Sequence, residues 1–271
     1  MKLDSAFPHI LERQYPVVKP DYPLLTVLYL LRMKDVDAVQ IVTQRGTRGR
    51  AVFGFSSLPK LVTLGPARFD RLLRGPCEEA SDTLVSLSVE ENLESLLETF
   101  NSSGLGVALV RGTGSDKRTG LVSLADVLRL YSSGAIHTDI TTEDVGTRIF
   151  SLPRNTPIRR ALQEMFRHSY RRIFLPGERT YVSDRGVMGY IFSPVVLEEI
   201  GNHPNEDILA APLDEPEKET PLVVAPGTAM KTAALKLEGD RGGCLVTRDD
   251  KVITPWDVVM KPWLSGRLTI G

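Results

Sequence analysis

Cysteine is scarce in this chain of 271 residues: only Cys77 and Cys244 are present, outside any CxxC or Cys/His pattern. Disulfide frameworks need several cysteines and structural zinc sites need clustered ligands, so neither is predicted. The four histidines show no ligand spacing either. We therefore expect no metal site and a reducing, cytoplasmic environment.

Long apolar runs are missing as well. No segment offers the roughly 20 apolar residues of a membrane span, and charges and a proline interrupt the first residues where a signal peptide would be apolar. The 33 Lys and Arg residues nearly balance the 34 Asp and Glu residues, for a formal charge of −1. Without a basic excess, neither nucleic acid nor an acidic membrane is a predicted partner.

Recognisable catalytic patterns are also absent. No GxSxG nucleophile motif occurs, and the loop Gly112–Lys117 lacks the Gly-Lys-Ser/Thr ending of a phosphate-binding loop. We therefore expect a protein that is not an enzyme. Its composition, 42% hydrophobic and 25% charged, is that of an ordinary globular protein, and its length suits two domains.

What the sequence does contain is an internal repeat. Four hexamers align without gaps, and each reads as a turn that leads into a helix. They are Lys19–Leu24, Ser88–Leu93, Pro153–Ile158 and Ala225–Met230. In the third copy Thr156 can cap the helix, Pro157 suits its first position, and a buried stripe follows at helical spacing. That stripe is Ile158, Ala161, Leu162, Met165 and Phe166.

Short apolar runs surround each predicted helix and read as strands. The last strand of each repeat is expected at Ala51–Phe55, Gly120–Val122, Val187–Ile191 and Lys251–Ile253. The closing helices are expected at Leu58–Val62, Leu124–Leu130, Pro194–Ile200 and Pro255–Met260. The prediction is thus an α/β (α+β) fold of four β-α-β-β-α repeats. A lone repeat would expose an apolar face, so we expect pairing.

The predicted domains are residues 1–133, with repeats at about 10–70 and 80–133, and residues 134–271, with repeats at about 145–201 and 208–265. The polar, glycine-bounded stretch Ser132–Gly146 is expected to link them.

The ends of the second and fourth repeats carry distinctive chemistry. They read Gly120-Leu121-Val122-Ser123-Leu124-Ala125-Asp126 and Lys251-Val252-Ile253-Thr254-Pro255-Trp256-Asp257. A hydroxyl at the first turn of a helix, beside free N–H groups, is well placed to hold a phosphate. An acid three residues later lies on the same face and can accept hydrogen bonds from a ribose.

This repeated unit, ending in Gly-apolar-apolar-Ser/Thr-x-x-Asp, resembles the cystathionine beta-synthase (CBS) domain, and a tandem pair resembles a Bateman module. The likeness covers nearly the whole chain. It implies a regulatory sensor that binds AMP, ADP, ATP or an S-adenosylmethionine-like ligand between paired repeats, without a catalytic cofactor. Ser123 and Thr254 would contact phosphate, and Asp126 and Asp257 would contact ribose.

The resemblance also implies further ligand contacts. Candidates for the adenine are Thr83, Val85, Thr220, Val223, Gly243 and Cys244. Candidates for phosphates across the cleft are Arg171 and Arg172.

Departures from the motif limit the number of competent sites. The first and third repeats have Lys60 and Val195 at the acidic position, and the third has Phe192 at the hydroxyl position. We therefore predict one competent cleft per pair. The fourth repeat has Lys251 in place of the motif glycine, which either restricts the backbone there or places a cation near phosphate.

Plainer interpretations remain open. Ser123 and Thr254 can be simple helix caps, with Asp126 and Asp257 as solvated first-turn acids. Arg171 and Arg172 can be solvated charges at a strand edge. The protein can be a ligand-free scaffold for an unidentified protein target. Nucleic-acid binding would have to use the basic loop Arg45–Arg50, because no nucleic-acid module is visible. The two pairs can form one monomeric disc or each find a mate in a homodimer.

Overall fold

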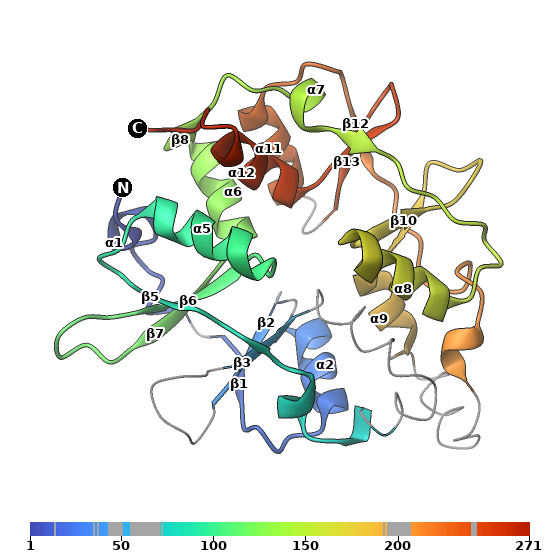
Figure 1. Cartoon of the computed structure of the whole chain (residues 1–271), viewed down its shortest axis with the longest axis horizontal. Helices are drawn as coiled ribbons and strands as arrows, with labels where there is room; N and C mark the ends of the chain where they lie inside the picture. The colour runs from blue at the N-terminus through green and yellow to red at the C-terminus, as the bar shows by residue number, and fades with distance from the viewer. Residues whose placement is uncertain are drawn as a thin grey trace. The chain divides into compact units, whose positions relative to one another are not determined.

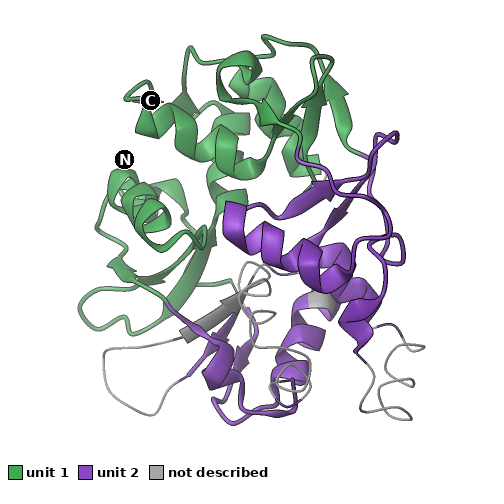
Figure 2. Cartoon of the chain, turned by 45° about the vertical axis from the view of Figure 1, so that its right-hand side comes forward, with its two compact units in different colours: residues 1–14, 84–149, 221–271 green, residues 15–83, 150–220 purple. Residues whose placement is uncertain are grey.

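The computed structural model describes residues 1–13, 15–34, 36, 38–42, 51–54, 71, 73–191, 193, 207–239 and 243–271 (Figure 1). The chain forms two compact units (Figure 2). Unit 1 contains Met1–Gln14, Leu84–Ile149 and Pro221–Gly271, and unit 2 contains Tyr15–Thr83 and Phe150–Thr220. Unit 1 therefore joins repeats two and four with the N-terminal segment, and unit 2 joins repeats one and three.

This grouping differs from a division of the chain at residue 133. Each compact unit takes one repeat from each half of the chain. The pairing of successive repeats within 1–133 and within 134–271 stays a prediction. The stretch Ser132–Gly146 is not an irregular linker, because it holds a strand and a helical turn and buries Ile140 and Val145 in unit 1.

Unit 1 shows the predicted order of elements in both of its repeats. Repeat two consists of β5 (Ser86–Ser88), α5 (Leu93–Ser103), β6 (Val107–Arg111), β7 (Thr119–Ser123) and α6 (Leu124–Ser133). Repeat four consists of β12 (Leu222–Val224), α11 (Met230–Gly239), β13 (Leu245–Thr247), β14 (Lys251–Ile253) and α12 (Pro255–Leu264). In each, the first two strands are parallel and the third is antiparallel to the second.

Short elements complete unit 1. They are α1 (Leu3–Ala6), β8 (Ile136–His137), α7 (Thr142–Val145), β9 (Thr147–Arg148) and β15 (Thr269–Ile270). Strand β9 extends the sheet of repeat four in the order β12-β13-β14-β9, and β15 pairs with β8.

Unit 2 has the same plan in repeat one where it is described, but repeat three has only an isolated parallel bridge of Ser151 with Phe174 in place of a first strand. Repeat one consists of β1 (Val17–Val18), α2 (Leu24–Met33), β2 (Ala38–Ile41) and β3 (Ala51–Gly54), followed by η3 (Cys77–Ala80) and β4 (Asp82–Thr83). Repeat three consists of α8 (Ile158–His168), β10 (Arg172–Phe174), β11 (Tyr181–Ser183) and α9 (Asp184–Ile191), with η4 (Ile208–Ala210) after it. Several predictions lie outside the described residues: the closing helices Leu58–Val62 and Pro194–Ile200, the basic loop Arg45–Arg50, and Lys60, Phe192 and Val195.

The predicted last strand of repeat three is wrong. Val187–Ile191 forms part of α9, and the strand is Tyr181–Ser183. The run was read as a strand because short apolar segments do not separate the two structures by pattern alone. In the structure Val187, Met188 and Ile191 are buried on one helical face, and the amide of Gly186 donates to the Ser183 hydroxyl at 2.9 Å. The hydroxyl position of repeat three is therefore Ser183 and its acidic position is Gly186, not Phe192 and Val195.

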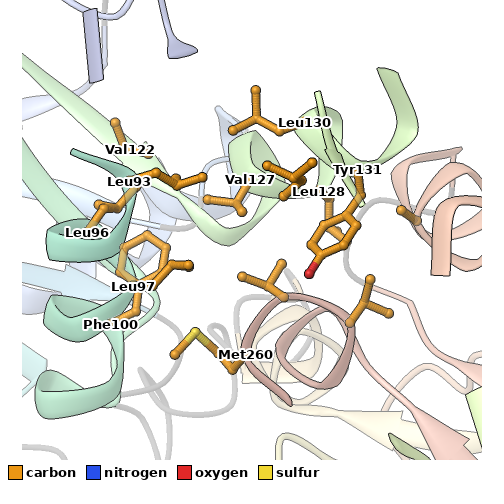
Figure 3. Packing of buried hydrophobic residues seen from close by; sticks show 14 of the residues in the cluster. Leu93, Leu96, Leu97, Phe100, Val122, Val127, Leu128, Leu130, Tyr131 and Met260 are labelled. Carbon is orange, nitrogen blue, oxygen red and sulfur yellow. The ribbon is translucent and has the colours of Figure 1, made fainter. Parts of the chain in front are cut away.

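The cores confirm the stripes that helical spacing predicts for the first helices of repeats one, two and four. All of their residues are buried: Leu24, Val27, Leu28 and Leu31; Leu93, Leu96, Leu97 and Phe100; and Met230, Ala233, Ala234 and Leu237. In unit 1 the apolar faces of α5, α6 and α12 converge, with Leu96, Phe100, Val127 and Met260 buried (Figure 3). Burying one such side chain contributes about 1.5 to 3 kcal/mol. In unit 2 the α8 stripe is buried except for Phe166, whose predicted burial is wrong because it is 47% exposed.

Tyr131 is an exception within the unit 1 core. Its ring is fully buried on α6, yet its hydroxyl has no hydrogen-bond partner among the described residues. Burial also raises the pKa of this phenol. A buried, unpaired polar group costs about 1 to 3 kcal/mol relative to water. We expect Tyr131→Phe to raise the free energy of unfolding by about 1 kcal/mol in urea titrations.

Tyr181→Phe is the matched control. This equally buried phenol donates to a Glu219 carboxylate oxygen at 2.9 Å, so its loss should lower stability. Equal effects of the two substitutions would contradict the assignment of Tyr131 as unpaired.

Candidate functional site

The end of repeat two places Ser123 and Asp126 together. Ser123 ends β7 and caps α6, and its backbone N–H and hydroxyl donate to Asp126 Oδ2 at 2.9 and 3.0 Å. This reciprocal arrangement is a capping box, which satisfies free donors at the start of a helix. Ser123 is therefore a helix cap, as the plainer interpretation predicted, but the predicted solvated state of Asp126 is wrong because this acid is buried. Contact of either residue with a nucleotide stays a prediction.

The second oxygen of Asp126 is occupied by two arginines. Oδ1 accepts from Arg13 Nη1 at 2.7 Å and from Arg129 Nη1 at 3.2 Å. Asp126 is 3% exposed. An ionised carboxylate accepts about four hydrogen bonds, so these contacts fill its capacity.

Repeat four has the same kind of capping box, but its acid, Asp257, keeps one unused acceptor position. Thr254 caps α12, and its N–H and hydroxyl donate to Asp257 Oδ2 at 2.8 and 2.7 Å. Asp257 Oδ1 lies 2.8 Å from Lys261 Nζ, and Asp257 is 6% exposed. Three of about four acceptor positions are therefore used.

The strands of repeat four bring further candidates to the same sheet edge. Leu245 pairs with Ile253, so Cys244 and Thr254 extend that register by one residue. The carbonyl of Cys244 accepts from the Leu222 amide at 3.2 Å. Gly243 and Cys244 are buried, whereas Val223 on β12 is 47% exposed.

The remaining adenine candidates divide between the units. Val85 belongs to unit 1 with Ser123 and Asp126, whereas Thr83 belongs to unit 2. Thr220 likewise ends a segment of unit 2. Thr83 and Thr220 are both exposed. Their roles as adenine contacts stay predictions.

Arg171 and Arg172 have partners inside repeat three. Arg171 Nε donates to Asp184 Oδ2 at 2.7 Å, and the guanidinium carbon of Arg172 lies 5.9 Å from the ring centre of Tyr181. Both arginines lie in unit 2 with these partners. The predicted contact with phosphate across a cleft stays a prediction.

The ammonium group of Lys251 contacts two nearby groups of unit 1. Its Nζ donates to the Glu143 carbonyl at 3.2 Å and lies 3.5 Å from an Asp249 carboxylate oxygen. These contacts give the lysine a structural role at α7.

The hydroxyl of repeat three is held by an acid from another segment. Ser183 donates to one oxygen of Glu219 and Tyr181 to the other. The backbones of Tyr181 and Glu219 also exchange two hydrogen bonds, each 2.9 Å long. A Cβ on Gly186 would come within 2.8 Å of the Glu217 carbonyl oxygen, so no aspartate fits at that position.

Sequence reasoning missed three of these residues. Ser183 carried a signal, a hydroxyl before a charged residue at a helix start, but the wrong strand assignment hid it. Arg13 and Glu219 carried none, because their partners lie 113 and 36 or more residues away.

Within the described residues, no group of three His, Cys, Asp or Glu side chains is placed to hold a metal ion. In the same part of the chain, no helix has the length and apolarity to cross a membrane.

Comparison with known proteins identifies the fold. No protein-family model and no curated protein matches the sequence. A protein from Methanocaldococcus jannaschii, described as a candidate archaeal homologue of g-AMPK, matches at a TM-score of 0.80 and 14% identity over 96% of this chain and 99% of its own. The chain has the fold of a CBS-domain protein.

Other solved structures match less well. An uncharacterized conserved protein from Pyrococcus horikoshii has a TM-score of 0.57 and 11% identity, over 96% of this chain and 98% of its own. A CBS domain protein from Pyrobaculum aerophilum, solved in complex with AMP, has a TM-score of 0.37 and 13% identity, over 46% of this chain and 89% of its own.

Proposed function

We propose that this chain is a non-catalytic regulatory protein that binds an adenine nucleotide at its CBS repeats, with repeat four as the primary site. The observation that carries the proposal is the pairing of Thr254 with the buried Asp257 at the first turn of α12. Support for the ligand class comes from the fold, which matches a candidate homologue of g-AMPK over nearly the full length of both chains.

The groups at repeat four suit the parts of a nucleotide. The remaining acceptor position of Asp257 can take a ribose hydroxyl, because an ionised carboxylate only accepts hydrogen bonds. The positive end of α12 favours the anionic end of the ligand. The Thr254 hydroxyl donates its proton to Asp257, so it can only accept a hydrogen bond from the ligand. Gly243 has no side chain at the neighbouring strand end, and the exposed Val223 offers an apolar surface to a base.

A regulatory role follows from what such a site can do. A nucleotide that binds one arrangement of the repeats better than another shifts the equilibrium by its difference in affinity, typically about 1 to 3 kcal/mol. A protein target in the cytoplasm that reads this change is part of the proposal.

Titration calorimetry tests the proposal directly. We expect heats of binding with at least one of AMP, ADP, ATP and S-adenosylmethionine. Asp257→Asn should weaken that binding about tenfold, because it removes the charged acceptor. Asp249→Asn is the control, since this acid is exposed in the turn before β14. Flat traces with folded wild-type protein, or equal binding by both variants, would contradict the proposal.

A ligand-free scaffold is the second candidate for repeat two. All acceptor positions of Asp126 are filled by groups of the chain itself. If repeat two is only a scaffold, the nucleotide binding that remains in Asp257→Asn should fit a single weakened site.

A further inference from the structure

The N-terminal segment of the chain packs on repeat two, although it precedes repeat one in sequence. The amides of Leu3 and Asp4 donate to the carbonyls of Glu91 and Val89 at 2.8 and 3.0 Å, and helix α1 lies beside α5 (Figure 1). Leu3 is fully buried in the unit 1 core. The segment is therefore an integral part of unit 1.

This packing brings Arg13 to the acid of repeat two. Arg13 Nη1 lies 2.7 Å from Asp126 Oδ1, and the Arg13 side chain is 47% exposed whereas that of Asp126 is 4% exposed. The pair thus joins a buried carboxylate to a guanidinium that reaches it from the solvent side. Such a charge-assisted hydrogen bond is strong, but its exposed half is screened by salt.

Repeat four has no counterpart of Arg13 among the described residues. Asp257 meets only its capping hydroxyl, its capping amide and Lys261, which comes from the same helix. Asp126 meets the same kind of cap, a basic residue of its own helix, Arg129, and Arg13 in addition. The two acidic positions therefore differ chiefly by this long-range arginine.

We propose that Arg13 gates the nucleotide site of repeat two. A ribose hydroxyl reaches Asp126 only after the Arg13 guanidinium leaves Oδ1, because the carboxylate has no further acceptor position. Repeat four then fills at lower nucleotide concentration than repeat two, and the protein responds over two concentration ranges. This inference rests on the proposed function, and it adds the regulation of one of its sites.

The test uses the full chain with repeat four weakened by Asp257→Asn. In that background we expect Arg13→Gln to tighten binding of AMP or ATP about tenfold, which is within the usual range of such couplings. Raising the salt concentration to about 0.5 M should reduce the difference in affinity between Arg13→Gln and its Asp257→Asn background. At that concentration screening already weakens the ion pair of Arg13 with Asp126. Arg13→Lys should give a smaller gain, since it keeps the charge but loses the planar fork.

Arg267→Gln is the matched control. It removes one arginine from an ion pair with Asp139 in the same unit, and that pair is exposed. If Arg13→Gln binds the nucleotide with the same affinity as Arg267→Gln, Arg13 is not a gate. In that case nucleotide binding by the wild type would still support the proposed function. Weaker binding by Arg13→Gln would also overturn the gate and make Arg13 a ligand contact. Absence of binding in every folded variant would overturn both proposals.

Discussion

Gly120→Ala is expected to lower the free energy of unfolding of unit 1 by about 3 kcal/mol, the upper end of the usual cost of overpacking. A Cβ at this position would lie 2.2 Å from the Ile10 carbonyl oxygen and 2.8 Å from its carbon. These are backbone atoms, and Ile10 is itself buried in the unit 1 core. The N-terminal segment would therefore have to move away from β7.

Tryptophan fluorescence during urea unfolding measures this effect within one unit. Both tryptophans of the chain, Trp256 and Trp263, lie on α12 in unit 1. Gly239→Ala is the control, because a Cβ there meets no atom within 4 Å and the helix conformation suits alanine. If the two variants unfold at the same urea concentration, the close approach of Ile10 to Gly120 is wrong.

Gly120 also shows what a motif alone conveys. The resemblance to CBS domains marks this glycine as part of a repeated pattern, but it does not say which atom approaches it. The structure gives a reason within the chain, since the N-terminal segment crosses directly over the glycine. The same segment carries Arg13 to Asp126. Substitutions of Gly120 and of Arg13 therefore both test the packing of the N-terminal segment on repeat two.

Local features of the sequence predicted most of the fold. The buried stripes of α2, α5, α8 and α11 follow from helical spacing, and only Phe166 departs from them. The pairing of Ser123 with Asp126 and of Thr254 with Asp257 also follows from spacing, because residues three apart lie on one helix face. Both boxes are confirmed as caps.

Two kinds of feature could not be predicted from local patterns. The first is a short apolar run: Val187–Ile191 is too short for its pattern to separate helix from strand, so the strand of repeat three was misplaced. The second kind depends on distant segments. The division into compact units depends on packing between helices of non-successive repeats, such as α6 with α11 and α12. The occupation of Asp126 by Arg13 depends on where the N-terminal segment lies.

Repeat three illustrates this dependence most fully. Its acidic position is Gly186, so it lacks the aspartate that completes the capping box in repeats two and four. Glu219, 36 residues beyond Ser183, supplies a carboxylate to the Ser183 hydroxyl instead. The predicted incompetence of repeat three for ribose stays a prediction, but its reason changes from Phe192 and Val195 to Gly186 and Glu219.

Glu219→Ala is expected to destabilise repeat three by about 2 kcal/mol, because hydrogen bonds to a charged acceptor contribute about 1.5 to 3 kcal/mol. Ser183 and Tyr181 are both buried and would lose their shared carboxylate. The loss corresponds to an approximately thirtyfold drop in amide hydrogen-exchange protection at Tyr181, whose amide donates to the Glu219 carbonyl. Glu217→Ala is the control, since that side chain is exposed and only its carbonyl approaches Gly186. Unchanged protection at Tyr181 in Glu219→Ala would show that the carboxylate does not hold repeat three together.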